Sequence, residues 1–322
     1  RGLQLYCRGV FIMDHAEDLL PDYLRFVKGL VDSQDLSLNI SRELLQHDHQ
    51  LKIIASRIEK KVLSELTNLL TKEREEYEKF WNKFGCYNNY GRDKDKLQDL
   101  LLFNSSKENK LVTLNEYVQR MKEDQKDIYY VSGSDVNLID KLPVVQTLKS
   151  KGFEVLYLTD NVDEFVMQSL MTYREKGFKN AAQGDLDIDS QEEKDELNKT
   201  KEENKELLDF MKDSLEEVSE VRLSSKLIDD PVCLTAGEGI SFEMERVFNN
   251  MPDNPMPMKA DRILEINPKH PIFERLKDLY TDDKDKVKEV AEVLYDQACL
   301  IEGFPIKDPI AYSRKICELL VK

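Results

Sequence analysis

Apolar residues recur every three or four positions along much of the chain, which is the spacing of an amphipathic helix. The clearest run begins at residue 51 and consists of Leu51, Ile54, Ile58, Val62, Leu66 and Leu69. A second run covers residues 77–84 and ends at Gly85, which predicts a left-handed helix cap at that glycine. Two further runs, over 283–302 and 309–321, predict a pair of helices.

Shorter stretches rich in β-branched and aromatic residues predict strands. Residues 3–13 predict a strand that runs into a buried segment. IYYVSGS at 128–134 and FEVLYLTD at 153–160 predict two strands on either side of a helix that Gly152 caps. A strand, a helix and a strand within about 30 residues are typical of a βαβ unit with a parallel strand pair.

The composition changes at Gly184. Between Asp185 and Glu206 the sequence has ten acidic residues, four lysines and almost nothing apolar, which predicts a linker or a solvated helix start. We therefore expect two domains. Residues 1–184 form an α/β domain with the βαβ unit and long helices, and 185–322 form an α+β domain that ends in the helix pair. The strands of the second domain are predicted at EVRLSS, VCLTA and RILEIN.

Charge and cysteine content exclude several classes of protein. With 47 Lys+Arg against 63 Asp+Glu the formal net charge is −16, so binding to nucleic acid is not expected. The sequence has no apolar run of membrane-spanning length and no signal peptide, which argues against a membrane protein. Five cysteines without a C-x-x-C pair favour reduced thiols and a cytoplasmic location.

The residues do not predict a self-contained active site. The SGSD turn after the first βαβ strand has one glycine and no following G-K-[ST], so structural packing is favoured over nucleotide binding. His47 and His49 would point to opposite sides of a helix, so we expect no metal site.

Two segments leave a functional alternative open. Arg42 and Gln46, four residues apart at a predicted helix start, are either solvated residues beside a cap or groups that reach a phosphate. The second segment is GEGISFEMERVFNNM, with Ile240, Met244, Val247 and Phe248 at helical spacing. This stripe is either a core face or an adaptable binding surface.

Several stretches together resemble one family, the ninety-kilodalton heat-shock chaperones in their bacterial form. The matching stretches are VFIMDHAEDLLPDYLRFVKGLVDSQDLSLNISRELLQ, MKEDQKDIYYVSG, GFEVLYLTDNVDEFVMQSL and ADRILEINPKHPIFERL. They occur in the order of the family and cover nearly the whole chain. The resemblance implies that 1–184 is the C-terminal part of a middle domain and 185–322 is a dimerisation domain. It also implies that a nucleotide-binding ATPase domain precedes this fragment.

The resemblance implies a cytoplasmic, homodimeric, ATP-dependent chaperone that assists the folding and remodelling of unfolded or partly folded clients. ATP and Mg²⁺ would be bound by the missing domain, so the fragment alone should be inactive as an enzyme. Arg42 would reach the γ-phosphate of ATP with support from Gln46. Clients would contact two segments at Phe165, Gln168, Ile240, Met244, Val247 and Phe248.

The last two predicted helices carry apolar stripes that could close a four-helix bundle between two subunits. The residues expected at this dimer interface are Val290, Leu294, Ala298, Ile316 and Leu320. The alternative is that both stripes pack on their own domain. Two other functions are weighed against the chaperone: an acidic helical scaffold without ATP linkage, and a small-molecule enzyme built on the βαβ unit.

Overall fold

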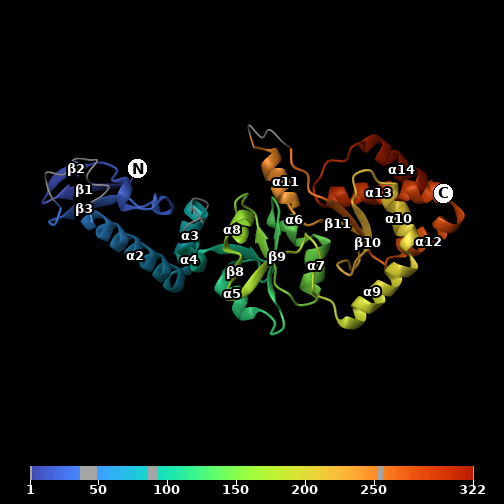
Figure 1. Ribbon diagram of the computed structural model, residues 1–322, viewed down its shortest axis with the longest axis horizontal. Helices are drawn as coiled ribbons and strands as arrows, with labels where there is room; N and C mark the ends of the chain where they lie inside the picture. Colours follow the sequence, from blue (N-terminus) through green and yellow to red (C-terminus); the bar gives the residue numbers. More distant parts are fainter. Residues whose placement is uncertain (1, 37–48, 86–92, 252–256, 322) are drawn as a thin grey trace. The chain divides into compact units, whose positions relative to one another are not determined.

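The computed structural model describes residues 2–36, 49–85, 93–251 and 257–321 (Figure 1). The chain divides into two compact units, each of which mixes helices and strands. The first unit comprises Arg1–Leu102, Leu111–Glu116 and Gln168–Leu170. The second comprises Phe103–Lys110, Tyr117–Met167 and Met171–Lys322. The expected mixture of helices and strands is confirmed.

The first unit contains a three-stranded sheet in the order β2-β1-β3. Its strands are β1 (Leu3–Cys7), β2 (Val10–Met13) and β3 (Gly29–Ser33). The predicted strand is confirmed as β1, but the buried segment expected after it is wrong, because the backbone turns at Arg8 and Gly9, which have φ of 53° and 75°, and β2 is not buried. Strands β1 and β2 therefore pair as an antiparallel hairpin. Alternate β1 residues are buried in the core that the sheet shares with Leu51.

Both long helices predicted for this unit are confirmed as α2 (His49–Lys72) and α3 (Arg74–Phe84). The left-handed cap predicted at Gly85 is wrong, because this residue has a right-handed φ of −56°. A Cβ at Gly85 would lie 2.7 Å from the Trp81 ring, so close packing rather than backbone freedom explains the glycine. The remaining elements are η1 (Glu17–Leu19), η2 (Asp22–Leu24), α4 (Lys94–Leu97), η4 (Gln98–Leu100) and β5 (Leu111–Thr113).

The second unit contains strands in the order β4-β7-β6-β9-β8. These are β4 (Leu102–Ser105), β6 (Asp127–Ser132), β7 (Leu156–Leu158), β8 (Thr172–Tyr173) and β9 (Lys176–Asn180). The helices along this stretch are α5 (Leu114–Arg120), α6 (Val136–Asp140), α7 (Pro143–Ser150) and α8 (Asp163–Leu170). Strands β6 and β7 are parallel and α6 and α7 connect them, which confirms the predicted βαβ unit. Gly152 ends this connection with a φ of 79°, as predicted.

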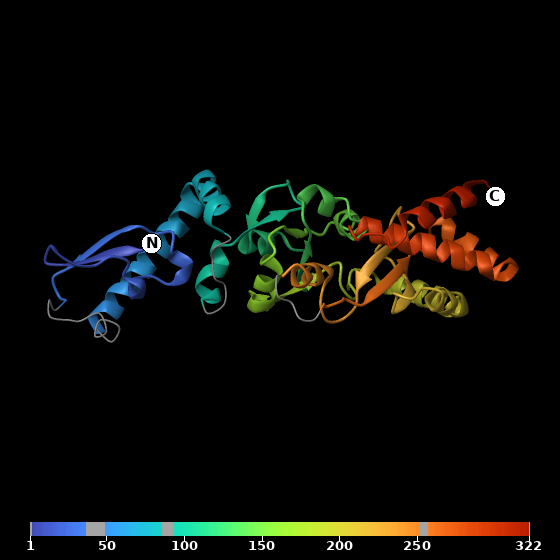
Figure 2. The ribbon, with the colours of Figure 1, turned by 90° about the horizontal axis from the view of Figure 1, so that it is seen from above.

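The rest of the second unit is built on a sheet in the order β10-β12-β11. All three predicted strands are confirmed, as β10 (Glu220–Leu223), β11 (Val232–Ala236) and β12 (Arg262–Ile266). The helices are α9 (Gln191–Glu203), α10 (Lys205–Asp213), α11 (Phe242–Asn249), α12 (Pro271–Asp282), α13 (Lys284–Ile301) and α14 (Pro309–Val321). Helix α13 packs on β11, and α14 lies beside α13 (Figure 2). Among the described helices, none is both long and apolar enough to cross a membrane.

The acidic segment after Gly184 forms a solvated helix, which is one of the two structures predicted for it. Helix α9 starts at a Ser190 capping box, and none of its 13 described residues is buried. The domain boundary at 184 remains a prediction. The two compact units divide elsewhere in the chain, and Gly184 N donates a hydrogen bond to Ala236 O within the second unit.

A buried carboxylate ties β10 to β12. Glu265 is 0% exposed and faces Arg222, its register partner on the neighbouring strand, with 2.6 Å between Arg222 Nη2 and Glu265 Oε1. Lys226 Nζ lies 3.1 Å from the same oxygen and donates to Gly184 O. Burial alone would raise the pKa of Glu265, but Lys226 and Arg222 hold it below the usual range.

Glu265→Gln should lower the free energy of unfolding of the second unit by about 3–5 kcal/mol, because it leaves two buried cations with too little counter-charge. Urea unfolding followed by far-ultraviolet circular dichroism measures this change. Glu220→Gln is the matched control, since Glu220 Oε2 lies 3.9 Å from the same arginine and is more exposed. The control should cost less than about 1 kcal/mol. Equal losses in the two variants would contradict the assignment.

Candidate functional site

The second unit contains a groove of about 1180 Å³. Its walls come from the loop after β6, helix α6, the loop before α8, helix α11 and the end of α13. The apolar side chains that matter most for its surface are Leu138, Val162, Phe165, Val247, Met251 and Leu300. Leu138 is 61% exposed and Leu300 is 49% exposed, so this apolar surface is open to solvent. We call this feature the α8–α11 groove.

The α8–α11 groove lies at the carboxyl end of β6. Strands β7 and β9 flank β6 and run parallel to it, so the carboxyl ends of the three strands lie at one edge of the sheet. In open α/β sheets, ligands bind outside the carboxyl ends of parallel strands. Ser132, Gly133 and Ser134 line this part of the groove. A Cβ at Gly133 would lie 2.9 Å from Ile139 Cγ1, so packing accounts for this glycine without any phosphate.

The structure brings three of the six predicted client-contact residues together. Phe165 and Val247 line the groove, and Phe248 meets the Phe165 ring edge-on with 5.8 Å between the ring centroids. The other three lie differently. Met244 is 5% exposed and faces the interior, Ile240 is half-buried against the core of the second unit, and Gln168 is exposed on α8. Of the two alternatives for the apolar stripe of α11, a core face or a binding surface, Met244 therefore fits the core face.

One buried carboxylate fixes the start of α11. Glu164 is 2% exposed, and its Oε2 accepts a hydrogen bond of 2.8 Å from Ser241 Oγ. It also accepts from Asn180 Nδ2 at 3.2 Å and from Ser132 Oγ at 3.3 Å. Burial raises the pKa of Glu164, and these donors oppose the rise. Ser241 is the N-cap of α11 and accepts from Met244 N, so Glu164 joins that cap to β6 and β9.

Cation–aromatic contacts fix the rest of α11. The Arg246 guanidinium donates to the main-chain oxygen of Glu302 and lies 4.7 Å from the ring centroid of Phe304. The Arg262 guanidinium lies 4.6 Å from the same ring and pairs with Glu245 at 2.8 Å. Each pair of this kind holds a desolvated cation on an aromatic face. Helix α11 is thereby attached to the segment that follows α13.

Sequence reasoning missed Glu164, Arg246 and the groove residues of α6 and α13. The signal for Glu164 was an acid next to the apolar run FVM, within the first turn of the helix DEFVMQSL. Such a position normally indicates a helix-dipole interaction at the surface. Its burial depends on Ser241, which lies 77 residues away in sequence and cannot be inferred from local pattern.

The residues predicted for dimerisation fall into two groups. Val290, Leu294 and Ala298 on α13 are buried in the core of their own chain, which is the packing alternative stated for this stripe. Ile316 on α14 is half-buried, whereas Leu320 is 81% exposed. Among the residues predicted for the dimer interface, those left partly or largely exposed therefore lie on α14.

Arg42 and Gln46 lie within 37–48, outside the residues that the structure describes, as does His47. Their phosphate-directed role stays a prediction. Within the described part of the chain, no group of three or more His, Cys, Asp and Glu side chains could hold a metal ion.

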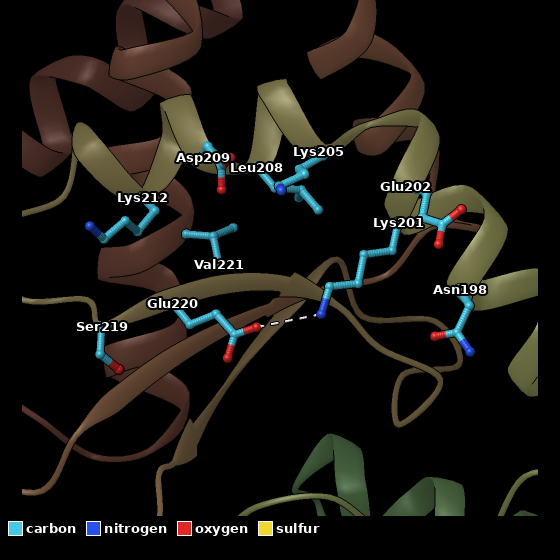
Figure 3. Close-up of a pocket in the computed structure, with 10 residues that line it drawn as sticks. All are labelled: Asn198, Lys201, Glu202, Lys205, Leu208, Asp209, Lys212, Ser219, Glu220 and Val221. Carbon is cyan, nitrogen blue, oxygen red and sulfur yellow. Dashed lines mark ion pairs between the residues drawn. The ribbon is translucent and has the colours of Figure 1, made fainter.

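A second hollow of about 640 Å³ lies between α9, α10 and β10 (Figure 3). Three lysines and three acids line it: Lys201, Lys205, Lys212, Glu202, Asp209 and Glu220. Lys201 Nζ lies 3.6 Å from Glu220 Oε1, and the charges balance. Its apolar lining is limited to Leu208 and Val221, which are buried. This hollow is therefore a weaker candidate than the α8–α11 groove.

Comparison with known proteins gives one consistent result. The sequence model of the Hsp90 protein family matches residues 1–322. The chain is 49% identical over 328 residues to "Chaperone protein HtpG" of Bacillus subtilis (strain 168), a match that covers 100% of this chain and 52% of that protein. It is 52% identical over 327 residues to the HtpG of Clostridium acetobutylicum, with coverage of 99% and 52%. The chain thus spans about half the length of these curated relatives.

The free energy of unfolding should fall as the pH rises from about 4.5 to about 7. Burial raises the pKa of Glu302, a groove residue, from its ordinary 4.5 to about 7, against the attraction of Arg246. In this window the folded chain holds a proton that the unfolded chain releases, so deprotonation favours unfolding. Burial also raises the pKa of Asp163 to about 7, which acts in the same direction.

Glu302→Gln cannot titrate and should reduce this slope, with Asp163 and Glu164 contributing to the remainder. Urea midpoints measured across the pH range test the effect. Glu216→Gln, at a carboxylate that is 88% exposed, serves as the control. A slope unchanged by Glu302→Gln would refute the role of this carboxyl.

Proposed function

The chain belongs to the Hsp90 family, and on that premise we propose that it binds unfolded or partly folded client proteins in the α8–α11 groove. The family resemblance read from the sequence is thereby confirmed, and the function of this chain within the family is the step that we add. The observation that carries the proposal is the exposed apolar surface of the groove, to which α6, α8, α11 and α13 all contribute.

The groove suits a client that has lost its fold. Such a client exposes apolar side chains, and their transfer from water to a surface such as Phe165 and Val247 provides the affinity. Met251 adds a flexible, polarisable side chain that adapts to different partners. The polar atoms of Ser132 and Ser134 can accept or donate hydrogen bonds to a client main chain. Varied sequences can therefore bind the same surface.

We further propose that the whole protein links client binding to ATP hydrolysis. ATP and Mg²⁺ would bind to a domain outside this sequence, and Arg42, assisted by Gln46, would contact the γ-phosphate. A guanidinium offers a planar, permanently charged fork that matches phosphoryl oxygens and can stabilise the transition state of phosphoryl transfer. This assignment rests on the family resemblance, as does the cytoplasmic location.

Phe165→Ser should weaken binding of an unfolded client at least tenfold, because it removes the aromatic surface that a bound apolar segment would cover. Reduced, carboxymethylated α-lactalbumin serves as the client, and fluorescence anisotropy gives the dissociation constant. Phe11→Ser is the matched control, since Phe11 is an exposed aromatic residue of the first unit. Circular dichroism and urea unfolding verify that both variants fold.

Equal weakening by Phe165→Ser and Phe11→Ser would show that clients adhere to any exposed aromatic residue. Wild-type affinity in a folded Phe165→Ser protein would likewise overturn the proposed site. Met244→Ser is unsuitable for this test, because Met244 is buried and its replacement would alter packing.

We also propose that α14 forms the dimer contact, because several of its apolar residues are largely exposed in the chain. Ile310 is exposed and Leu320 is largely exposed. Ile316→Asp combined with Leu320→Asp should convert a dimer to a monomer, since the interface would bury two carboxylates without partners. Sedimentation velocity measures the result. Leu30→Asp, at an exposed apolar residue of the first unit, is the control, and a double variant that stays dimeric would refute the contact.

A further inference from the structure

The α8–α11 groove is lined by two cationic side chains, and only one of them forms an ion pair within the described part of the chain. Arg246 pairs with Glu243 at 3.1 Å and donates to the Glu302 main-chain oxygen. Lys141 also lines the groove, and its side chain is exposed. Among the described residues, no carboxylate forms an ion pair or hydrogen bond with the Lys141 ammonium. The groove thus carries one cation that is available to a ligand.

The acids nearest to Lys141 in sequence are already engaged. Asp140 Oδ1 accepts from Lys149 Nζ at 2.7 Å and from Tyr157 Oη at 2.5 Å. Asp135 Oδ1 caps helix α6 and accepts from Asn137 N and Leu138 N. Because these hydrogen bonds hold both carboxylates in place, a carboxylate from outside the chain meets little competition at Lys141.

Lys141 is positioned beside an apolar contact. It is the C-cap of α6, and its main-chain N–H donates to the carbonyl of Leu138. Leu138 lies three residues earlier, so the two side chains project from the same side of the helix end. The backbone is therefore fixed while the lysine side chain is exposed. An apolar client residue that covers Leu138 brings the next client residues within reach of the ammonium.

We infer that the α8–α11 groove prefers apolar client segments flanked by aspartate or glutamate, and that Lys141 determines this preference. The inference rests on the proposed function, since it concerns clients bound in that groove. The chain as a whole has a net charge of −16, which repels acidic segments at long range. The preference therefore depends on local pairing at the groove and should weaken as salt screens it.

Two peptides with the same apolar core test the inference, one flanked by aspartates and the other by lysines. Fluorescence anisotropy on the full chain gives their dissociation constants. The aspartate peptide should bind about threefold to fivefold more tightly at low salt, as expected of one partly exposed ion pair. Lys141→Gln should remove this ratio, and Lys141→Glu should reverse it.

Lys199→Glu controls for total charge, because it changes the net charge equally at an exposed lysine on α9. A wild-type ratio of one, a ratio unaffected by Lys141→Glu, or an equal change in Lys199→Glu would overturn the inference. Phe165→Ser distinguishes failure of the charge preference from failure of the proposed client-binding site. Suppose that Phe165→Ser weakens binding of both peptides while substitutions of Lys141 leave the ratio of the two dissociation constants unchanged. Binding in the groove is then supported, and the charge preference assigned to Lys141 is wrong. If Phe165→Ser weakens neither, the proposed function itself fails.

Discussion

The arrangement of the second unit depends on how a short helix is held against a sheet from which it is distant in sequence. Helix α11 has eight residues, too few to be stable in isolation. Its N-cap serine binds Glu164 of α8, and Arg246 binds the chain beyond α13. If either contact were lost, the groove would lose the wall that Val247 provides. The apolar surface therefore exists because polar side chains fix its edges.

Two buried glutamates solve the same electrostatic problem in different ways. Glu265 is neutralised by Arg222 and Lys226, whose charges overcome the effect of burial on its pKa. Glu164 instead accepts hydrogen bonds from two hydroxyls and an amide, none of which is charged. Neutral donors cannot fully replace the hydration of a carboxylate, so the pKa of Glu164 rises. Glu265, inside a sheet, is thus stabilised by ion pairs. Glu164, beside the groove, is stabilised by hydrogen bonds from neutral groups.

Local patterns predicted the long helices and about half of the described strands but could not predict the site. Helical periodicity is visible within one segment, and α2, α13 and α14 were expected for that reason. The hairpin at Arg8 and the packing of Trp81 on Gly85 depend on backbone and tertiary detail that periodicity does not contain. The groove is still less accessible to prediction, because Leu138 and Leu300 come from segments 162 residues apart (300 − 138). Family resemblance supplied Phe165 and Val247, and spatial placement then separated them from the buried Met244.

The exposure of helix α9 affects how readily this helix opens compared with the core of the second unit. Its described residues are all at least partly exposed. Leu197 packs against the core around Leu264, and the rest of the stability of the helix comes from the Ser190 capping box, backbone hydrogen bonds and surface ion pairs. Such a helix can open while the buried residues of that core stay packed. Its amide hydrogens should therefore exchange with solvent water long before those of β12. In the same way, a protease should cut within 191–203 while the rest of the second unit is still folded.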